Sequence, residues 1–297
     1  MEMTQLRYVV ALARTGNFSR AAEQCNVSQP SLSQQIQKLE DELGERLFDR
    51  MKRQTKLTSH GEVFFRRAVV ILAEAEMALR EASEAKSLVS GTCTIGVLPT
   101  IAPYLLPEAI GLFTRKYPGV EIVVQEDTTA QLLKQLAAYE LDFAIASHPI
   151  QDRRLEIKEL FAEELLLALP PRHPLAQKRT VSAAALRRER LIIMRQEHCL
   201  GDQVLGFCAQ RDVKATISFR SAQLETIHAL VSAGLGLSLI PAMAAKVKRS
   251  DALEYRSIQG PRPHRKIIAL WPRQRPLSHA ARAFLEIMPA HGSNSGT

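Results

Sequence analysis

The segment from residue 28 to residue 44 constrains the fold more than any other part of the chain. Ser28 and Pro30 are typical of the first turn of a helix, and Gly44 is typical of its end. Between them, apolar residues recur at spacings of four, three and four, at Leu32, Ile36, Leu39 and Leu43. This stripe predicts a short amphipathic helix that packs on other elements through one face only.

The other face of this predicted helix is polar and rich in hydrogen-bond donors. Two shorter helical patterns precede it, one beginning near Thr4 and one near Ser19. Two helices joined by a tight turn, the second with a polar outer face, place a recognition helix in the major groove of DNA, where glutamine pairs with adenine. The candidate DNA contacts are Ser28, Gln29, Pro30, Ser31, Ser33, Gln34, Gln35 and Lys38.

A basic segment follows the predicted recognition helix. Residues 50–56 hold four basic side chains and no acidic one. Arginine and lysine on a short hairpin suit backbone phosphates and the minor groove, and Arg50 and Arg53 are the candidates here. Either feature alone fits a solvated surface equally well, but their ordered combination favours double-stranded DNA as a partner.

Residues 59–88 predict one long helix with a heptad seam. The seam is rich in alanine, which lets two helices approach closely, and it consists of Phe64, Ala68, Ile71, Ala75, Ala78, Ala82 and Ala85. It could pack on its own domain. We favour a dimerisation helix, because paired reading heads suit a pseudo-palindromic operator.

From residue 92 onward the pattern changes to alternating strands and helices. The predicted strands are 92–98, 120–125, 142–147, 164–169, 191–195, 216–219, 237–240 and 266–271, with helices at 104–117, 131–138 and 224–232. This indicates an α/β region with largely parallel sheets, whose ligands bind at the carboxyl ends of strands. Periodicity leaves open whether the region is one domain or two lobes around a cleft.

The charge distribution qualifies the DNA interpretation. The net charge is +8, from 39 basic and 31 acidic residues, and such an excess favours a polyanionic partner. Residues 1–88 carry a net charge of only +1, whereas residues 89–297 carry +7. DNA affinity must therefore come from the local cluster at 50–56, and the excess within 246–282 indicates only a solvated surface.

The cysteines and the uncharged runs indicate the cellular compartment in which the protein is expected. Cys25, Cys93, Cys199 and Cys208 form no C-x-x-C pair, so neither a disulfide framework nor a zinc ribbon is expected, and we predict no metal site. We expect a reducing cytoplasm. An uncharged run of 17 residues from 229 to 245 is interrupted by glycine and proline, and no membrane association is predicted.

Taken together, these segments resemble the LysR-type transcriptional regulators. The matching stretches are residues 27–36 (VSQPSLSQQI), 39–44 (LEDELG), 47–50 (LFDR), 57–61 (LTSHG) and 233–236 (AGLG). The resemblance implies a multi-domain α/β chain: a winged helix-turn-helix at 1–58, a linker and dimerisation helix at 59–90, and a two-lobed effector domain, like periplasmic binding proteins, at 91–297. Lobe I would comprise about 92–163 plus 268–297, and lobe II about 164–267. It also implies a homotetramer built as a dimer of dimers, and RNA polymerase as a partner.

Three further stretches resemble the hydrogen peroxide sensors within this family, namely 98–107 (LPTIAPYLLP), 197–203 (EHCLGDQ) and 206–208 (GFC). The resemblance implies that a Cys199 thiolate reacts with hydrogen peroxide and forms a reversible disulfide with Cys208, which thioredoxin or glutaredoxin resets, and that the oxidised protein activates antioxidant genes. No cofactor is implied. The supporting residues would be Thr100, Thr129, His198, Asp202 and Arg265, the last chosen over Lys266. Gly201 departs from the pattern, in which a basic residue is common.

Geometry adds an independent argument about the two cysteines. Cys199 and Cys208 are nine residues apart, so a helix between them would separate them by about 13 Å. A disulfide needs Cα atoms within about 7 Å. Oxidation must then unwind or refold this segment, which is what a two-state switch requires.

Two other functions stay open. The chain could be a LysR-type regulator of another small-molecule effector, with the cysteines vestigial, or it could be a thiol peroxidase enzyme. The enzyme hypothesis leaves the first 90 residues unexplained, so we expect a transcription factor rather than an enzyme. For Cys25 and Cys93 we expect structural roles, because free cysteine is mostly a small buried hydrophobe.

Overall fold

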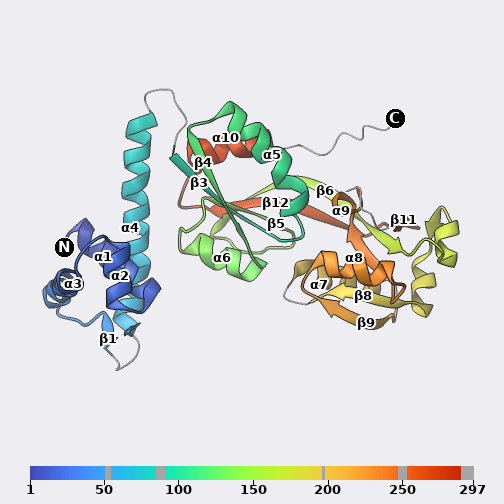
Figure 1. The fold of residues 1–297 in the computed structure, drawn as a ribbon, viewed down its shortest axis with the longest axis horizontal. Coiled ribbons are helices and arrows are strands. Elements are labelled where there is room, and N and C mark those ends of the chain that lie inside the picture. The colour runs from blue at the N-terminus through green and yellow to red at the C-terminus, as the bar shows by residue number, and fades with distance from the viewer. Residues whose placement is uncertain (51–54, 85–90, 196–197, 247–252, 289–297) are drawn as a thin grey trace. The chain divides into compact units, whose positions relative to one another are not determined.

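The computed structural model describes residues 1–50, 55–84, 91–195, 198–246 and 253–288, with backbone alone at 50, 76, 77 and 80–84. The chain divides into two compact units, Met1–Leu88 and Val89–Thr297 (Figure 1). Within the described residues, no helix has both the length and the apolar character that crossing a bilayer requires.

The first unit is a winged helix-turn-helix followed by a long helix. Its elements are α1 (Met3–Thr15), α2 (Phe18–Gln24), α3 (Gln29–Leu43), β1 (Phe48–Arg50), β2 (Thr55–Leu57) and α4 (Ser59–Glu84). The helix predicted from the apolar stripe is α3. The Ser28 hydroxyl accepts a hydrogen bond from the Ser31 N–H at 3.4 Å, and Gly44 ends the helix in the left-handed conformation with φ 70°. Leu32, Ile36 and Leu39 are buried in the core.

The wing is the antiparallel hairpin of β1 and β2. A buried carboxylate attaches it to the recognition helix: Glu40 Oε1 accepts the backbone N–H groups of Leu47 at 2.7 Å and Phe48 at 3.1 Å. On the other strand, the Thr55 N–H donates to the Gly16 carbonyl at 3.1 Å. Two otherwise unpaired backbone donors are thus satisfied by one side chain, which fixes the start of the wing relative to α3.

Part of the heptad seam of α4 packs within this unit, and part of it is exposed. Ala68 is buried where α4 packs on α1, whereas Ile71 and Ala78 are exposed. Val63 and Leu79 are also exposed, so an apolar stripe on α4 is left uncovered within this unit. Ala82 lies outside the described side chains and Ala85 outside the described residues.

The second unit is built on a mixed sheet. Its strands are β3 (Gly91–Val97), β4 (Val120–Glu126), β5 (Phe143–Ser147), β6 (Leu155–Leu169), β7 (Thr180–Val181), β10 (Ser238–Pro241), β11 (Glu254–Ile258) and β12 (His264–Pro272). Their order is β4-β3-β5-β12-β6-β11-β7, and β10 also pairs with β6. A separate parallel pair consists of β8 (Arg190–Met194) and β9 (Thr216–Ser221).

Two hydrophobic cores make this unit two-lobed. One core contains β3, β5 and three helices: α5 (Ala102–Lys116) and α10 (His279–Ile287) lie side by side on one face, and α6 (Thr129–Ala137) covers the other (Figure 1). The other core contains β8, α7 (Cys199–Gln210), α8 (Leu224–Ser232) and α9 (Ala242–Ala245). β6 is 15 residues long and serves both cores, with Phe161 in the first and Leu165 in the second.

The expectation of largely parallel sheets is wrong. β12 pairs antiparallel with both β5 and β6, and β10 and β11 pair antiparallel with β6. The long strand β6 leaves the first lobe and β12 returns to it beside β6, which requires opposite directions. Residue periodicity reports which face of a strand is buried but not the direction of its neighbour.

Four basic residues of the C-terminal half form ion pairs with glutamates of β6. Ion pairs join Arg262 to Glu164 at 3.1 Å, Arg265 to Glu163 at 2.8 Å, Lys266 to Glu159 at 2.9 Å and Arg273 to Glu156 at 2.9 Å. We call these four pairs the β6–β12 ladder. The solvated basic surface predicted for 246–282 is therefore, at these positions, one side of a set of cross-strand ion pairs.

Candidate functional site

Cys199 is the first residue of α7, close behind the end of β8. His198 is buried and precedes the helix, and its carbonyl accepts the Gly201 N–H at 2.9 Å. A Cβ atom at Gly201 would lie 2.5 Å from the Met194 carbonyl oxygen, so α7 approaches the β8 backbone more closely than any side chain permits. This explains the glycine at 201. A basic residue there requires α7 to stand further from β8.

Three predicted supporting residues surround the Cys199 thiol. Burial raises the pKa of Cys199, and the positive charge of Arg265, the Thr129 hydroxyl and the Leu200 N–H act in the opposite direction, while the Asp202 carboxylate raises the pKa further. Burial dominates, so the pKa of the Cys199 thiol lies above its usual value. Among the predicted supporting residues, Arg265 and Thr129 favour the ionised sulfur and Asp202 disfavours it.

Thr129 begins α6 and faces this thiol from the other lobe. Its Oγ1 is buried and makes no hydrogen bond of normal geometry to a described nitrogen or oxygen. Its proximity to Cys199 lowers the pKa of the thiol. The hydroxyl is therefore free to donate to the sulfur or to a small polar molecule beside it.

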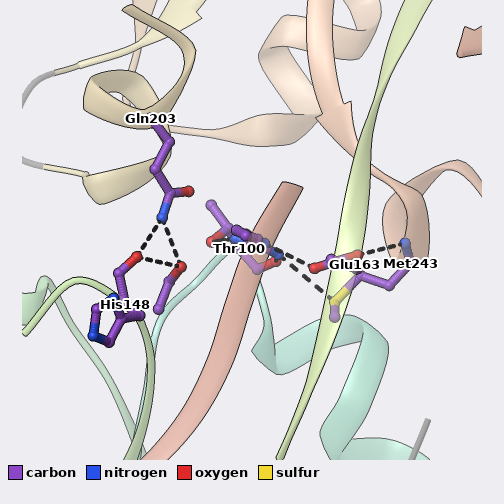
Figure 2. A network of polar contacts seen from close by, with 7 residues as sticks. Thr100, His148, Glu163, Gln203 and Met243 are labelled. Carbon is purple, nitrogen blue, oxygen red and sulfur yellow. Dashed lines mark hydrogen bonds and ion pairs between the residues drawn. The ribbon is translucent and has the colours of Figure 1, made fainter. Parts of the chain in front are cut away.

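Arg265 is the centre of a buried polar network that joins both lobes (Figure 2). Its Nε donates to Glu163 Oε1 at 2.8 Å, and its Nη1 and Nη2 donate to the Thr100 hydroxyl and carbonyl, each at 3.0 Å. The Met243 N–H donates to Glu163 Oε2 at 2.9 Å. Thr100 thus reaches the site through Arg265. Glu163 and Met243 were missed, since the pairing of β6 with β12 brings Glu163 here and the pairing of β10 with β6 brings Met243 here.

A second polar contact joins α7 to the first lobe. Gln203 Nε2 donates to Ser147 Oγ at 2.7 Å and to the His148 carbonyl at 2.9 Å (Figure 2). Gln203 lies one turn after Cys199 on the same helix, so this contact fixes the helix that carries the thiol. Gln203 stands in a stretch that the sequence singled out, but its partners were not predicted.

A cavity of about 690 Å³ opens beside Cys199. Its lining mixes apolar side chains with charged and polar ones, which include Asp202, Gln203, His148, Arg211, Arg262, His264, Arg265 and Lys266. The Cys199 sulfur therefore borders a space in which a guanidinium and other donors can bind a small oxygen compound and a leaving hydroxide.

Cys208 is not among the residues that line this cavity. It is buried in the core of the second lobe, and burial raises the pKa of its thiol. Both cysteines are free, and α7 is helical from Cys199 to Gln210, so the two residues are about 13 Å apart along its axis. Cys25 is half-buried in the first unit and Cys93 is fully buried in β3.

The outer face of α3 forms a second candidate site. A shallow concavity is lined by Gln29, Pro30, Ser33, Gln34, Gln35, Gln37, Lys38 and Asp41, all of them predicted except Gln37 and Asp41. Ser31 is exposed beside it, whereas Ser28 is the helix cap. Gln35 is half-buried, and its Oε1 accepts from Gln5 at 3.4 Å. Arg50 ends β1, and Arg53 lies outside the described residues.

Comparisons with known proteins match both units of the chain. Residues 3–62 match the bacterial regulatory helix-turn-helix protein, lysR family, and residues 86–293 match the LysR substrate binding domain. The chain is 38% identical over 268 residues to the DNA-binding transcriptional dual regulator OxyR of Escherichia coli, covering 90% of this chain and 88% of that protein.

Solved structures show the same likeness. A cysteine-to-aspartate variant of full-length OxyR from Pseudomonas aeruginosa superposes with a TM-score of 0.83 at 33% identity, covering 97% of this chain and 94% of that one. A cysteine-to-serine variant of Corynebacterium glutamicum OxyR, bound to H2O2, superposes with a TM-score of 0.64 at 30% identity, covering 97% and 93%.

Proposed function

The chain belongs to the LysR family of bacterial transcriptional regulators, and from this membership we propose that it senses hydrogen peroxide through Cys199 and Cys208. Cys199 attacks one peroxide oxygen, the O–O bond breaks, and hydroxide leaves as the sulfur becomes a sulfenic acid. The Cys208 thiol then displaces water from that sulfenic acid to form a disulfide. The oxidised protein activates antioxidant genes.

The observation that carries this proposal is the grouping of Thr129 and Arg265 around Cys199, with Cys199 and Arg265 both bordering the cavity. Arg265 and Thr129 both favour the ionised sulfur, although burial keeps its pKa raised. Relatives that align with about nine-tenths of the chain are named hydrogen peroxide-inducible genes activators, and one similar structure contains bound H2O2. Thr100 and His198 complete the proposed site.

The proposed disulfide requires α7 to refold, because the helix holds the two sulfurs too far apart. Unwinding α7 removes Gln203 from Ser147 and His148 and withdraws Cys208 from its core. These changes connect the redox state to the contact between the lobes. Thioredoxin or glutaredoxin is the proposed reductant, and the cytoplasm is the proposed compartment.

DNA recognition is assigned to the outer face of α3 and to the wing, acting on a pseudo-palindromic double-stranded operator. The exposed apolar stripe of α4 is assigned to self-association into a dimer, and a dimer of dimers then contacts RNA polymerase. On this proposal, residues 1–58 read DNA, 59–90 link and dimerise, and 91–297 sense, with lobes at about 92–163 plus 268–297 and about 164–267.

The test is a footprint of the full chain on its upstream DNA, with reduced and peroxide-treated protein. Wild type and Cys25→Ser are expected to change their footprint with peroxide, whereas Cys199→Ser is expected to keep the reduced one. A peroxide response of Cys199→Ser equal to wild type contradicts the proposal and favours another effector. Peroxide consumption far beyond one equivalent per Cys199, with thioredoxin supplied, favours a thiol peroxidase instead.

A further inference from the structure

The four rungs of the β6–β12 ladder differ in burial. The side chains of Arg265 and Glu163 are 0% and 7% exposed, whereas those of Lys266 and Glu159 are 47% and 52% exposed. Arg262 and Arg273 are also exposed in their pairs. Water screens the charges of the exposed pairs. Within this ladder, the charges of Arg265 and Glu163 therefore have the strongest electrostatic effect on a neighbouring group.

Glu163 is held on both carboxylate oxygens. Oε1 accepts from Arg265 Nε and Oε2 accepts from the Met243 N–H at the start of α9. Arg265 in turn is fixed at its far end by Thr100. Figure 2 shows this chain of contacts running from Met243 through Glu163 to Thr100. Glu163 therefore determines where the guanidinium of Arg265 can lie.

The same carboxylate weakens the field of the guanidinium it positions. A cation paired at 2.8 Å with a buried anion presents a much smaller net charge to a third group than a free cation does. Cys199 is such a third group. Other charged or titratable groups near it are Asp202 on α7, the adjacent His198, and His148, His264 and Lys266 around the cavity.

We propose that Glu163 is a positioning residue that holds Arg265 beside Cys199 and offsets its charge, so that Glu163 limits the reactivity of the sulfur. This inference rests on the proposed role of Cys199 in peroxide sensing. The pair would set how much oxidant is needed before the sensor responds.

The test measures the pH dependence of Cys199 alkylation by iodoacetamide in the full chain carrying Cys208→Ser, followed by mass spectrometry of the Cys199 peptide. Glu163→Gln keeps the shape and a hydrogen-bond acceptor but removes the charge. In this variant the midpoint of the pH profile of Cys199 alkylation is expected to fall. The alkylation rate at pH 7 then increases by about tenfold, because the thiolate fraction is tenfold larger.

The matched control is Glu159→Gln, which removes the same charge from an exposed rung of the same strand. Its alkylation profile is expected to equal wild type, and the Cys25 peptide serves as an internal reference in the other unit. An unchanged midpoint in folded Glu163→Gln, or an equal fall in Glu159→Gln, overturns the inference. No peroxide is used, so failure of the peroxide proposal does not alter this result.

If Glu163→Gln fails to fold, the double variant Glu163→Met/Arg265→Met replaces the buried pair with apolar side chains of similar volume. Because the pair is nearly neutral as seen from the sulfur, alkylation at pH 7 is expected to slow by less than about threefold. A decrease of about tenfold or more shows that Arg265 acts as an unshielded cation, which also overturns the inference.

Discussion

Cys199 and Cys208 lie on opposite faces of one helix and contact different hydrophobic cores. Nine residues correspond to about two and a half turns, so their side chains point in opposite directions. Cys199 packs against the core of the first lobe, and Cys208 belongs to the core of the second. No rotation of side chains can join the two sulfurs, so a disulfide between them has to change the backbone.

This relationship predicts where oxidation loosens the protein. In the reduced chain, the amide protons of residues 203–208 are protected by the α7 hydrogen bonds. After peroxide treatment their hydrogen exchange is expected to accelerate by at least about tenfold, because the helix must unwind. Hydrogen-exchange mass spectrometry of both forms checks this. The β5 peptide is the reference, and equal protection of α7 in both redox states argues against the disulfide switch.

The close approach of α7 to β8 predicts an asymmetry between two glycines of the same helix. Gly201→Ala places a Cβ atom 2.5 Å from the Met194 oxygen and is expected to lower the free energy of unfolding by about 1–3 kcal/mol. Gly206 has no atom within 4 Å of an added Cβ, so Gly206→Ala should be neutral or stabilise by up to about 1 kcal/mol. Denaturant titration of the reduced proteins measures both. A smaller loss for Gly201→Ala than for Gly206→Ala contradicts the assigned packing.

The raised pKa of Cys199 predicts how the proposed reaction with peroxide depends on pH. Only the thiolate attacks peroxide, and its fraction increases with pH until the raised pKa is passed. The oxidation rate is therefore expected to rise by about tenfold for each pH increment of one below that pKa. Stopped-flow measurements from pH 6 to pH 9 test this, and a rate that is flat across neutral pH indicates a depressed pKa instead.

Glu40 is predicted to connect the recognition helix to the wing. Glu40→Ala leaves the Leu47 and Phe48 N–H groups without their acceptor, and we expect the unfolding free energy to decrease by about 1–3 kcal/mol. DNA affinity should fall as well, because the wing loses its fixed position. Calorimetry and fluorescence anisotropy measure the two effects. Glu23→Ala, an exposed carboxylate on α2, is the control that should leave both unchanged.

Two DNA-contact variants separate base reading from phosphate binding. Gln34 is exposed on the outer face of α3, so Gln34→Ala is expected to relax base specificity at one operator position with little change in the salt dependence of binding. Arg53→Ala is expected to weaken binding to all sequences and to reduce the salt slope by about one. Titrations at several salt concentrations on matched and scrambled operators check this. Equal slopes for wild type and Arg53→Ala remove the wing assignment.

Much of the first unit could be predicted from the sequence, because helices are determined locally. The cap at Ser28, the proline in the first turn, the apolar stripe and the glycine at 44 all lie within 17 residues, and they delimit α3 in the structure. The flanking stretches of Cys199 and Cys208 likewise suggested the proposed redox pair, by family resemblance and without any structure. These local signals identify the candidate residues and the helices or strands on which they lie.

The tertiary structure alone decided which distant groups surround those residues. Glu163 and Arg265 are 102 residues apart, and they meet only because β6 and β12 pair in one particular register and direction. Ser147 and Gln203 meet because α7 packs across the two lobes. Strand pairing and lobe packing depend on burial of the whole core rather than on local preference, and for that reason the raised pKa of Cys199 and the carboxylate that offsets Arg265 could be found only in the folded chain.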